Sequence, residues 1–211
     1  MKTEQLLEAL VADQASRRQP IARSLFRAMA LGAGLSLLFF AVELGVRVDI
    51  GPALETWRFD LKIVTVLLAL VLAIGLCLDC LRPDASPHPL RRLLPLLAVV
   101  LTAIAVELLA VPLSGWRARL IGSNSLICLS MVPVLSLAPL AAILAVLRRG
   151  APASPTLAGA AAGFLAAACG ATLYAFHCFD DSPLFVATWY LLAAIPVVVI
   201  GAVAGSRLLR W

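Results

Sequence analysis

The sequence predicts an all-α polytopic membrane protein with six transmembrane helices and both termini in the cytoplasm. Three observations lead to this fold class. The 211 residues are 62% hydrophobic and only 14% charged, whereas a soluble domain is about half apolar and about a quarter charged. The apolar residues gather in six blocks, each close to the roughly twenty residues that a helix needs to cross a bilayer. Lys and Arg are concentrated in alternate segments between these blocks.

The six predicted transmembrane helices lie at 25–46, 61–81, 93–112, 125–147, 155–176 and 184–208. Each block is continuously apolar, and the mean hydropathy of the chain is +1.00. The alternating strands of a membrane barrel are therefore not expected. The blocks and their short connections form one membrane domain, 25–211, which follows a polar amphipathic segment, 1–24. A secretory signal is not expected, because the first apolar block begins only after that polar segment.

The orientation follows from the distribution of Lys and Arg. Twelve of these 17 residues fall in segments on the same side as the termini, and five fall on the other side. The five are Arg47, Arg58, Lys62, Arg117 and Arg119. The positive-inside rule then places both termini in the cytoplasm. The net charge of +5 is explained by this bias and by contact with anionic lipid. Direct binding to nucleic acid is not expected, because no compact basic domain lies outside the bilayer.

The N-terminal segment has the pattern of a short amphipathic helix. Its apolar stripe consists of Leu6, Leu7, Leu10 and Val11. Thr3 can cap the start of the helix, and Pro20 ends it. About four turns are marginally stable alone, so the stripe needs a covering surface. That surface is either the lipid headgroups and the bundle, or a groove on a cytoplasmic protein partner.

The fifth block is rich in small residues and predicts a helix at the centre of the bundle. Gly159 and Gly163 form a small-xxx-small pair, which Ala166 and Gly170 continue. Such faces allow helices to approach closely. In the fourth and sixth blocks, Pro133, Pro139 and Pro196 predict kinks.

Few ionisable residues fall inside the predicted spans. Glu43 and Glu107 lie near outer helix ends, as does the polar Asn124. Transporters usually place such groups near the middle of the bilayer, at broken helices. The bare middle therefore argues against an ion or proton pathway.

The five cysteines differ in predicted depth. Cys77 and Cys80 form a CxxC near the inner end of the second span, where a reduced thiol pair is expected. Cys169 lies in the middle of the fifth span and is interpreted as packing. Neither group gives a strong indication of function.

Cys128 and Cys178 form the more informative pair. They lie near the outer ends of the fourth and fifth spans, which a short inner loop joins as an antiparallel hairpin. Two thiols at one depth on adjacent helices can approach disulfide range. They can also share a soft metal ion, with His177 as a nitrogen donor and Asp180 or Asp181 as oxygen donors. Disulfide formation, metal capture, reaction of a single thiol, and plain burial in packing are all compatible with the pattern.

The aspartates also have a structural interpretation. Ser182 and Pro183 fit the N-cap and first position of the sixth helix. Asp180 and Asp181 directly precede them, and we expect both carboxylates to help cap this helix rather than to bind metal.

Several stretches resemble one protein family over essentially the whole chain. They are MKTEQLLEALVAD at the N-terminus, GSNSLIC ending at Cys128, LRRGAP from 147 to 152, and YAFHCFDDSPLFVATWY from 174 to 190. The HCxDDSPLF part is the most specific. These stretches resemble the NrsF family, negative regulators of sigma-F, which are six-span anti-sigma factors of the bacterial inner membrane.

The resemblance implies a function. Such proteins hold an extracytoplasmic-function (ECF) sigma factor at the membrane and release it under heavy-metal or oxidative stress. Sensing in the family is associated with two cysteines, which match Cys128 and Cys178 here. His177, Asp180 and Asp181 are candidate supporting groups because of their position beside Cys178 and their donor chemistry, not because of the resemblance. From topology, the expected partner surface combines Leu6, Leu7, Leu10, Val11, Arg148 and Arg149. The expected partners are the sigma factor, the lipid bilayer and a transient heavy-metal ion.

No catalytic residue and no cofactor are expected. A small metal or solute transporter is the first alternative, and the bare middle of the spans argues against it. A membrane thiol–disulfide oxidoreductase is the second. This alternative is disfavoured because the CxxC of Cys77 and Cys80 faces the reducing side of the membrane.

Overall fold

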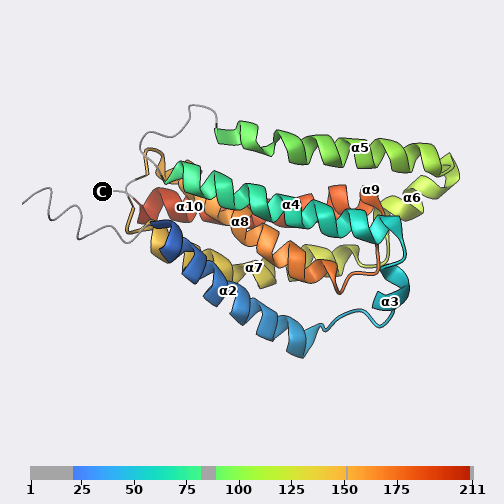
Figure 1. The fold of residues 1–211 in the computed structure, drawn as a ribbon, viewed down its shortest axis with the longest axis horizontal. Coiled ribbons are helices and arrows are strands. Elements are labelled where there is room, and N and C mark those ends of the chain that lie inside the picture. The colour runs from blue at the N-terminus through green and yellow to red at the C-terminus, as the bar shows by residue number, and fades with distance from the viewer. Residues whose placement is uncertain (1–20, 82–88, 151, 210–211) are drawn as a thin grey trace, which may run out of the picture.

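The computed structural model describes residues 21–81, 89–150 and 152–209. These residues form a helical bundle without strands (Figure 1). The long helices are α2 (Ile21–Glu43), α4 (Trp57–Cys80), α5 (Leu94–Ala110), α7 (Ser125–Leu147), α8 (Pro155–Ala175) and α10 (Leu191–Leu208). Helix α10 is preceded without a break by α9 (Pro183–Phe185) and a π-helical turn, η2 (Val186–Tyr190). The shorter elements are α3 (Ile50–Ala53), α6 (Leu113–Ile121) and the 3-10 helix η1 (Pro89–Leu93).

The all-α, six-span prediction is confirmed. Six described helices are long and apolar enough to cross a membrane. The fourth predicted span, 125–147, coincides with α7, and the others agree within a few residues. The largest shift is at the first span, which was predicted at 25–46 and is observed at Ile21–Glu43. The predicted N-terminal stripe of Leu6, Leu7, Leu10 and Val11 lies outside the described residues.

Helix α8 is the central helix, as its small residues predict. In α8, 67% of the membrane-span window is buried, against 39% or less for every other span. Its small face packs on α10, where a Cβ at Gly159 would lie 2.2 Å from the carbonyl oxygen of Gly201. The reciprocal contact is nearly as close, because a Cβ at Gly201 would lie 2.4 Å from the carbonyl oxygen of Gly159. Glycines on both helices therefore permit backbone contact at this interface.

Helices α2 and α7 meet at a proline. Pro139 has no N–H, so the carbonyl oxygen of Leu135, one turn earlier, lacks its usual intrahelical donor. The buried Ser36 hydroxyl of α2 donates to that oxygen at 2.6 Å. One turn away, a Cβ at Gly32 would lie 2.6 Å from the Cα of Pro139. A hydroxyl and a glycine on α2 thus fit the polar and steric irregularity that Pro139 creates in α7.

The two ends of the bundle differ in character. In Figure 1, α3, α6 and α9 gather at one end, which carries Cys128 and Cys178 and is called the thiol end below. The opposite end holds the first residues of α2 and the last residues of α10. It is called the arginine end because it exposes Arg23, Arg27, Arg91, Arg92, Arg148, Arg149 and Arg207. Helix α5 runs along one side of the bundle, and only 11% of its span window is buried.

Candidate sensing site

Cys128 and Cys178 lie together in one buried cluster at the thiol end. Both side chains are 0% exposed, and both thiols are free. Cys128 lies in the first turn of α7, and Cys178 follows the last turn of α8. Tyr174 and Tyr190 belong to the same cluster, and their rings lie 5.9 Å apart. The hairpin of α7 and α8 therefore brings the two thiols to one depth, as their spacing in the sequence predicts.

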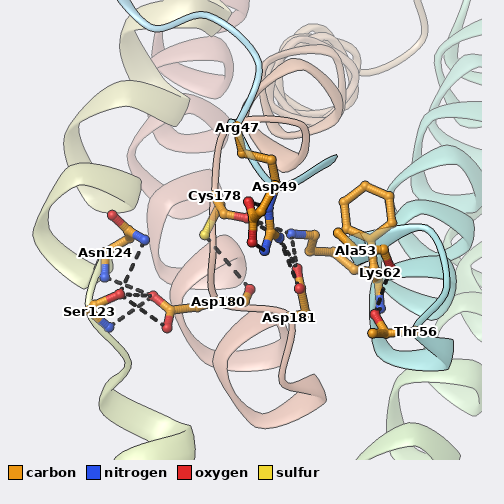
Figure 2. Close-up of polar contacts among 11 residues, drawn as sticks. Arg47, Asp49, Ala53, Thr56, Lys62, Ser123, Asn124, Cys178, Asp180 and Asp181 are labelled. Atoms are coloured by element: carbon orange, nitrogen blue, oxygen red, sulfur yellow. Dashed lines mark hydrogen bonds and ion pairs between the residues drawn. The ribbon is translucent and has the colours of Figure 1, made fainter. Parts of the chain in front are cut away.

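The backbone around Cys178 is held by two buried cations (Figure 2). The Nη1 atom of Arg47, from the connection after α2, donates to the Cys178 carbonyl oxygen at 3.1 Å. The Nζ atom of Lys62, from α4, donates to the same oxygen at 2.9 Å. The Lys62 side chain is fully buried, and that of Arg47 is 5% exposed. Elements far apart in the sequence thus converge on one peptide oxygen.

Asp181 balances these two charges. Its carboxylate accepts from Arg47 at 2.9 Å and forms an ion pair with Lys62. Asp49 also pairs with Arg47, at 2.7 Å, and this hydrogen bond lowers the pKa of the Asp49 carboxyl and raises that of the Arg47 guanidinium. Buried ions require such partners, because removing one leaves an uncompensated charge in a medium of low polarity.

Asp180 points to the other side of the loop, as Figure 2 shows. Its Oδ2 atom accepts from the backbone N–H groups of Ser123 and Asn124, at 2.9 and 2.8 Å. Asp180 therefore caps the start of α7, where unpaired N–H groups favour an anion. The approach requires glycine at Gly122, which has φ 60° and where a Cβ would lie 2.6 Å from the Asp180 carboxyl carbon.

The expectation that both aspartates cap the sixth helix is wrong. Ser182 and Pro183 do occupy the N-cap and first position of α9, but the carboxylates are committed to α7 and to the cations. The Ser182 hydroxyl is also used elsewhere, because it donates to Oε1 of Glu107 at 3.3 Å.

A second buried charge lies beside this loop. Glu107 of α5 is 0% exposed and pairs with Arg58 of α4 at 2.9 Å and with Arg119 of α6 at 3.6 Å. Together with Ser182, these contacts connect α4, α5, α6 and α9. From the sequence, Arg47, Arg58 and Lys62 were used only to predict the orientation of the helices in the membrane. Lys62 could have indicated the ion pair, because it is a cation inside the predicted span 61–81, at about the same depth as Asp180 and Asp181.

The supporting groups do not form a ready metal site. Within the described ranges, no group of three His, Cys, Asp or Glu residues is placed to hold a metal ion. His177 Nδ1 lies 3.1 Å from the carbonyl oxygen of Gly45, and the ring stacks obliquely on Tyr174. Asp180 and Asp181 are occupied as described above.

The chemical state of Cys178 follows from its surroundings. Burial raises the pKa of its thiol above the ordinary value, with Lys62 acting in the opposite direction. The thiol donates to the Asp180 carbonyl oxygen at 3.7 Å. Cys178 is therefore a protonated thiol at neutral pH, and a reaction partner must enter the protein and accept a proton.

The other predicted residues lie apart from this site. Cys77 and Cys80 are buried in a separate apolar cluster, among Leu, Ile and Ala side chains. Cys169 is also buried, in the middle of α8. Arg148 and Arg149 are exposed at the arginine end.

Comparison with known proteins identifies the family. The sequence profile of NrsF, described as negative regulator of sigma F, matches residues 10–211.

The chain belongs to the NrsF family. It is 34% identical to the probable anti-sigma-F factor NrsF of Azospira oryzae and 36% identical to the anti-sigma-F factor NrsF of Caulobacter vibrioides. Both alignments cover 100% of each chain. No solved structure matches the chain. The NrsF resemblance seen in the sequence stretches is thus confirmed, and the related NrsF proteins are named as regulators rather than enzymes.

Proposed function

We propose that this protein is a membrane-bound anti-sigma factor. It holds an ECF sigma factor at the bacterial inner membrane and releases it when Cys128 and Cys178 react under oxidative or heavy-metal stress. The family and the names of both full-length relatives support negative regulation of a sigma factor. In this proposal the arginine end faces the cytoplasm and the thiol end faces outward, in accord with the positive-inside rule.

The observation that carries the sensing role is the position of Cys178. Its thiol lies in the cluster with Cys128, while its carbonyl oxygen is bound by both Arg47 and Lys62. Any reaction that moves this residue must disturb contacts to the α2–α3 connection and to α4. A chemical change at the thiols thereby alters helix packing beyond α7 and α8.

The route to the cytoplasmic end runs through α7 and α2. Cys128 lies two turns from Leu135, whose carbonyl oxygen accepts from Ser36 of α2. Helix α2 follows directly on the N-terminal segment, where Leu6, Leu7, Leu10 and Val11 are predicted to dock on the sigma factor. Movement of α7 against α2 changes the position from which that segment extends. A switch requires that each state has its own set of contacts. The hydrogen bond from Ser36 to the Leu135 carbonyl oxygen is a contact that can be made in one packing of α2 on α7 and lost in the other.

The exposed arginines supply the second part of the proposed docking surface. Arg148 and Arg149 close α7 at the arginine end and are exposed. Among the described residues of this end, Arg92 forms an ion pair with Asp79. The remaining guanidinium groups suit an acidic surface on the partner.

The test of sensing is the double variant Cys128→Ser, Cys178→Ser in cells that carry a sigma-dependent reporter. We expect normal repression without stress and no induction by oxidant or cadmium. The variant Cys77→Ser, Cys80→Ser is the matched control, because it changes two buried thiols of the other cluster. Normal induction in the Cys128/Cys178 variant would show that sensing occurs elsewhere.

Docking is tested by co-purification of the sigma factor from membranes. Deletion of residues 2–14 removes the predicted stripe and should abolish recovery of the sigma factor while leaving the six helices in the membrane. Unchanged recovery would place the binding surface entirely on the remaining chain.

A further inference from the structure

An apolar groove lies beside the thiol cluster, between α5 and the rest of the bundle. Its volume is about 300 Å³, at the lower end of the range for small-molecule sites. Leu97 and Val100 of α5 form one wall, and Ala168, Ala171 and Ala194 form the opposite one. Small side chains on α8 and α10 leave this space open, and the groove lies along the apolar length of the spans.

Tyr190 separates the groove from the two thiols. It lines the groove and also belongs to the cluster of Cys128 and Cys178. The side chain is 7% exposed, and its hydroxyl lies near the Cys178 thiol. Among the described residues, this hydroxyl is the one buried side-chain oxygen or nitrogen that has no oxygen or nitrogen partner, and the polar group beside it is the Cys178 thiol, a weak hydrogen-bonding group. A buried donor of this kind is costly unless a ligand or a movement satisfies it.

The local backbone also departs from a regular helix at this point. Val186–Tyr190 form a π-helical turn between α9 and α10. Such turns are rare and occur frequently at functional sites. The groove, the unsatisfied hydroxyl and the π-turn thus coincide at one residue.

Both thiols are closed to water. Cys128 and Cys178 are each 0% exposed, so a charged or strongly hydrated reactant reaches them only when the bundle opens, whereas a reactant dissolved in the bilayer can approach through the groove. A reactant that reaches them from the groove must dissolve in the bilayer. It must also accept a hydrogen bond from a phenol and take up two electrons and two protons from a pair of thiols.

We propose that the groove binds a lipid-soluble quinone, which oxidises Cys128 and Cys178 to a disulfide. The ring lies against Tyr190, whose hydroxyl donates to a quinone carbonyl, and the apolar tail follows the groove along α5. Two S–H bonds break and one S–S bond forms. The two electrons and two protons pass to the quinone, which leaves as the quinol. This inference rests on the proposed function, since it names the oxidant for the same thiol pair.

The test uses the full-length protein, reduced, in lipid nanodiscs free of quinone and oxygen. A decyl-substituted benzoquinone is added, and the free Cys128 and Cys178 thiols and the quinol are measured together by maleimide mass tagging and chromatography. We expect one quinol for each disulfide formed. Thiols that stay reduced with this quinone but are oxidised by diamide would overturn the quinone site.

Variants locate the reaction in the groove. Ala171→Leu and Ala194→Leu should slow quinone-driven oxidation about tenfold or more, because leucine fills the space that the ring needs. Tyr190→Phe should slow it while keeping the ring packing. Ala141→Leu is the control, since Ala141 is exposed on α7 outside the groove lining. Equal rates in Ala171→Leu and Ala141→Leu would refute binding in this groove.

A competition measurement avoids reliance on folding of the variants. A dimethoxybenzene with the same decyl tail cannot be reduced and should block oxidation of the wild-type protein. Failure to compete would indicate that only lipid chains occupy the groove. Diamide separates the two proposals: release of the sigma factor by diamide without oxidation by quinone leaves the anti-sigma function intact and removes the quinone site.

Discussion

The two ends of the bundle use charge in opposite ways. At the thiol end, Lys62, Arg47 and Glu107 are buried and paired, and their contacts join helices that are distant in the sequence. At the arginine end, the described cations are mostly exposed, and the ion pair of Asp79 with Arg92 lies on the surface. Buried charges must keep their partners, whereas exposed charges can exchange water for another molecule.

The difference assigns separate tasks to the two ends. A network of buried ions holds the loop around Cys178 in one arrangement, so a reaction at the thiol must compete with that network. An exposed basic surface does not fix the positions of neighbouring helices, and it remains available to an acidic partner or to anionic lipid. Variants at the thiol end should therefore change stability, and variants at the arginine end should change binding.

The largest effect on stability is expected for Lys62→Met. The substitution leaves Asp181 with one cation fewer and removes a donor from the Cys178 carbonyl oxygen. Breaking a buried pair typically costs about 3–5 kcal/mol. Thermal unfolding in detergent should show a large loss of stability, and Cys178 should react faster with maleimide.

Arg92→Met is the matched control at the arginine end. Its pair with Asp79 is partly exposed, so the expected cost is about 0–1 kcal/mol. Equal losses in the two variants would contradict the distinction between the ends.

A smaller loss is expected for Ser36→Ala, at the contact that connects the ends. It removes the donor to the Leu135 carbonyl oxygen, which Pro139 leaves unpaired. A buried acceptor without a partner costs about 1–3 kcal/mol. Chemical denaturation should detect this loss, and the reporter strain should show weaker induction. Ser130→Ala is the control, because its hydroxyl is exposed and bonds within its own helix. A Ser36 variant with normal stability and normal induction would exclude this contact from the coupling route.

The third effect is expected for Asp180→Ala, which removes the cap of α7. Loss of an N-cap typically costs about 1 kcal/mol. The first turn of α7, which carries Cys128, should then exchange its amide hydrogens faster. Hydrogen exchange measured by mass spectrometry gives the local effect, with the first turn of α8, capped by Ser154, as the internal reference. Unchanged exchange in α7 would mean that Asp180 contributes little to its cap.

The sequence was informative where a feature is carried by neighbouring residues. Continuous apolar runs predicted the six helices, and the glycines of 155–176 predicted the central helix. The hairpin of α7 and α8 is also local, so the common depth of Cys128 and Cys178 could be deduced from it.

Pairings between distant segments were not predictable in the same way. The ion pair of Lys62 with Asp181 and the cap of α7 by Asp180 depend on which helices become neighbours. The sequence shows that Pro139 lacks an N–H, but Ser36, which donates to the Leu135 carbonyl oxygen that Pro139 leaves free, lies 99 residues away in the chain. A pattern within one segment cannot indicate which of several polar residues meets it in the folded bundle.

The smallest effect on stability, and the sharpest test of the arginine end, is expected for the double variant Arg148→Ala, Arg149→Ala. Both side chains are exposed, so the stability of the bundle should stay within about 0.5 kcal/mol of the wild type. Recovery of the sigma factor should fall, and its salt dependence should weaken, because exposed charges act mainly on the rate and specificity of association. Arg117→Ala, an exposed cation at the thiol end, is the control and should leave recovery unchanged. If both variants reduce recovery equally, the effect reflects general charge rather than a docking surface, and the two ends would no longer differ in their proposed tasks.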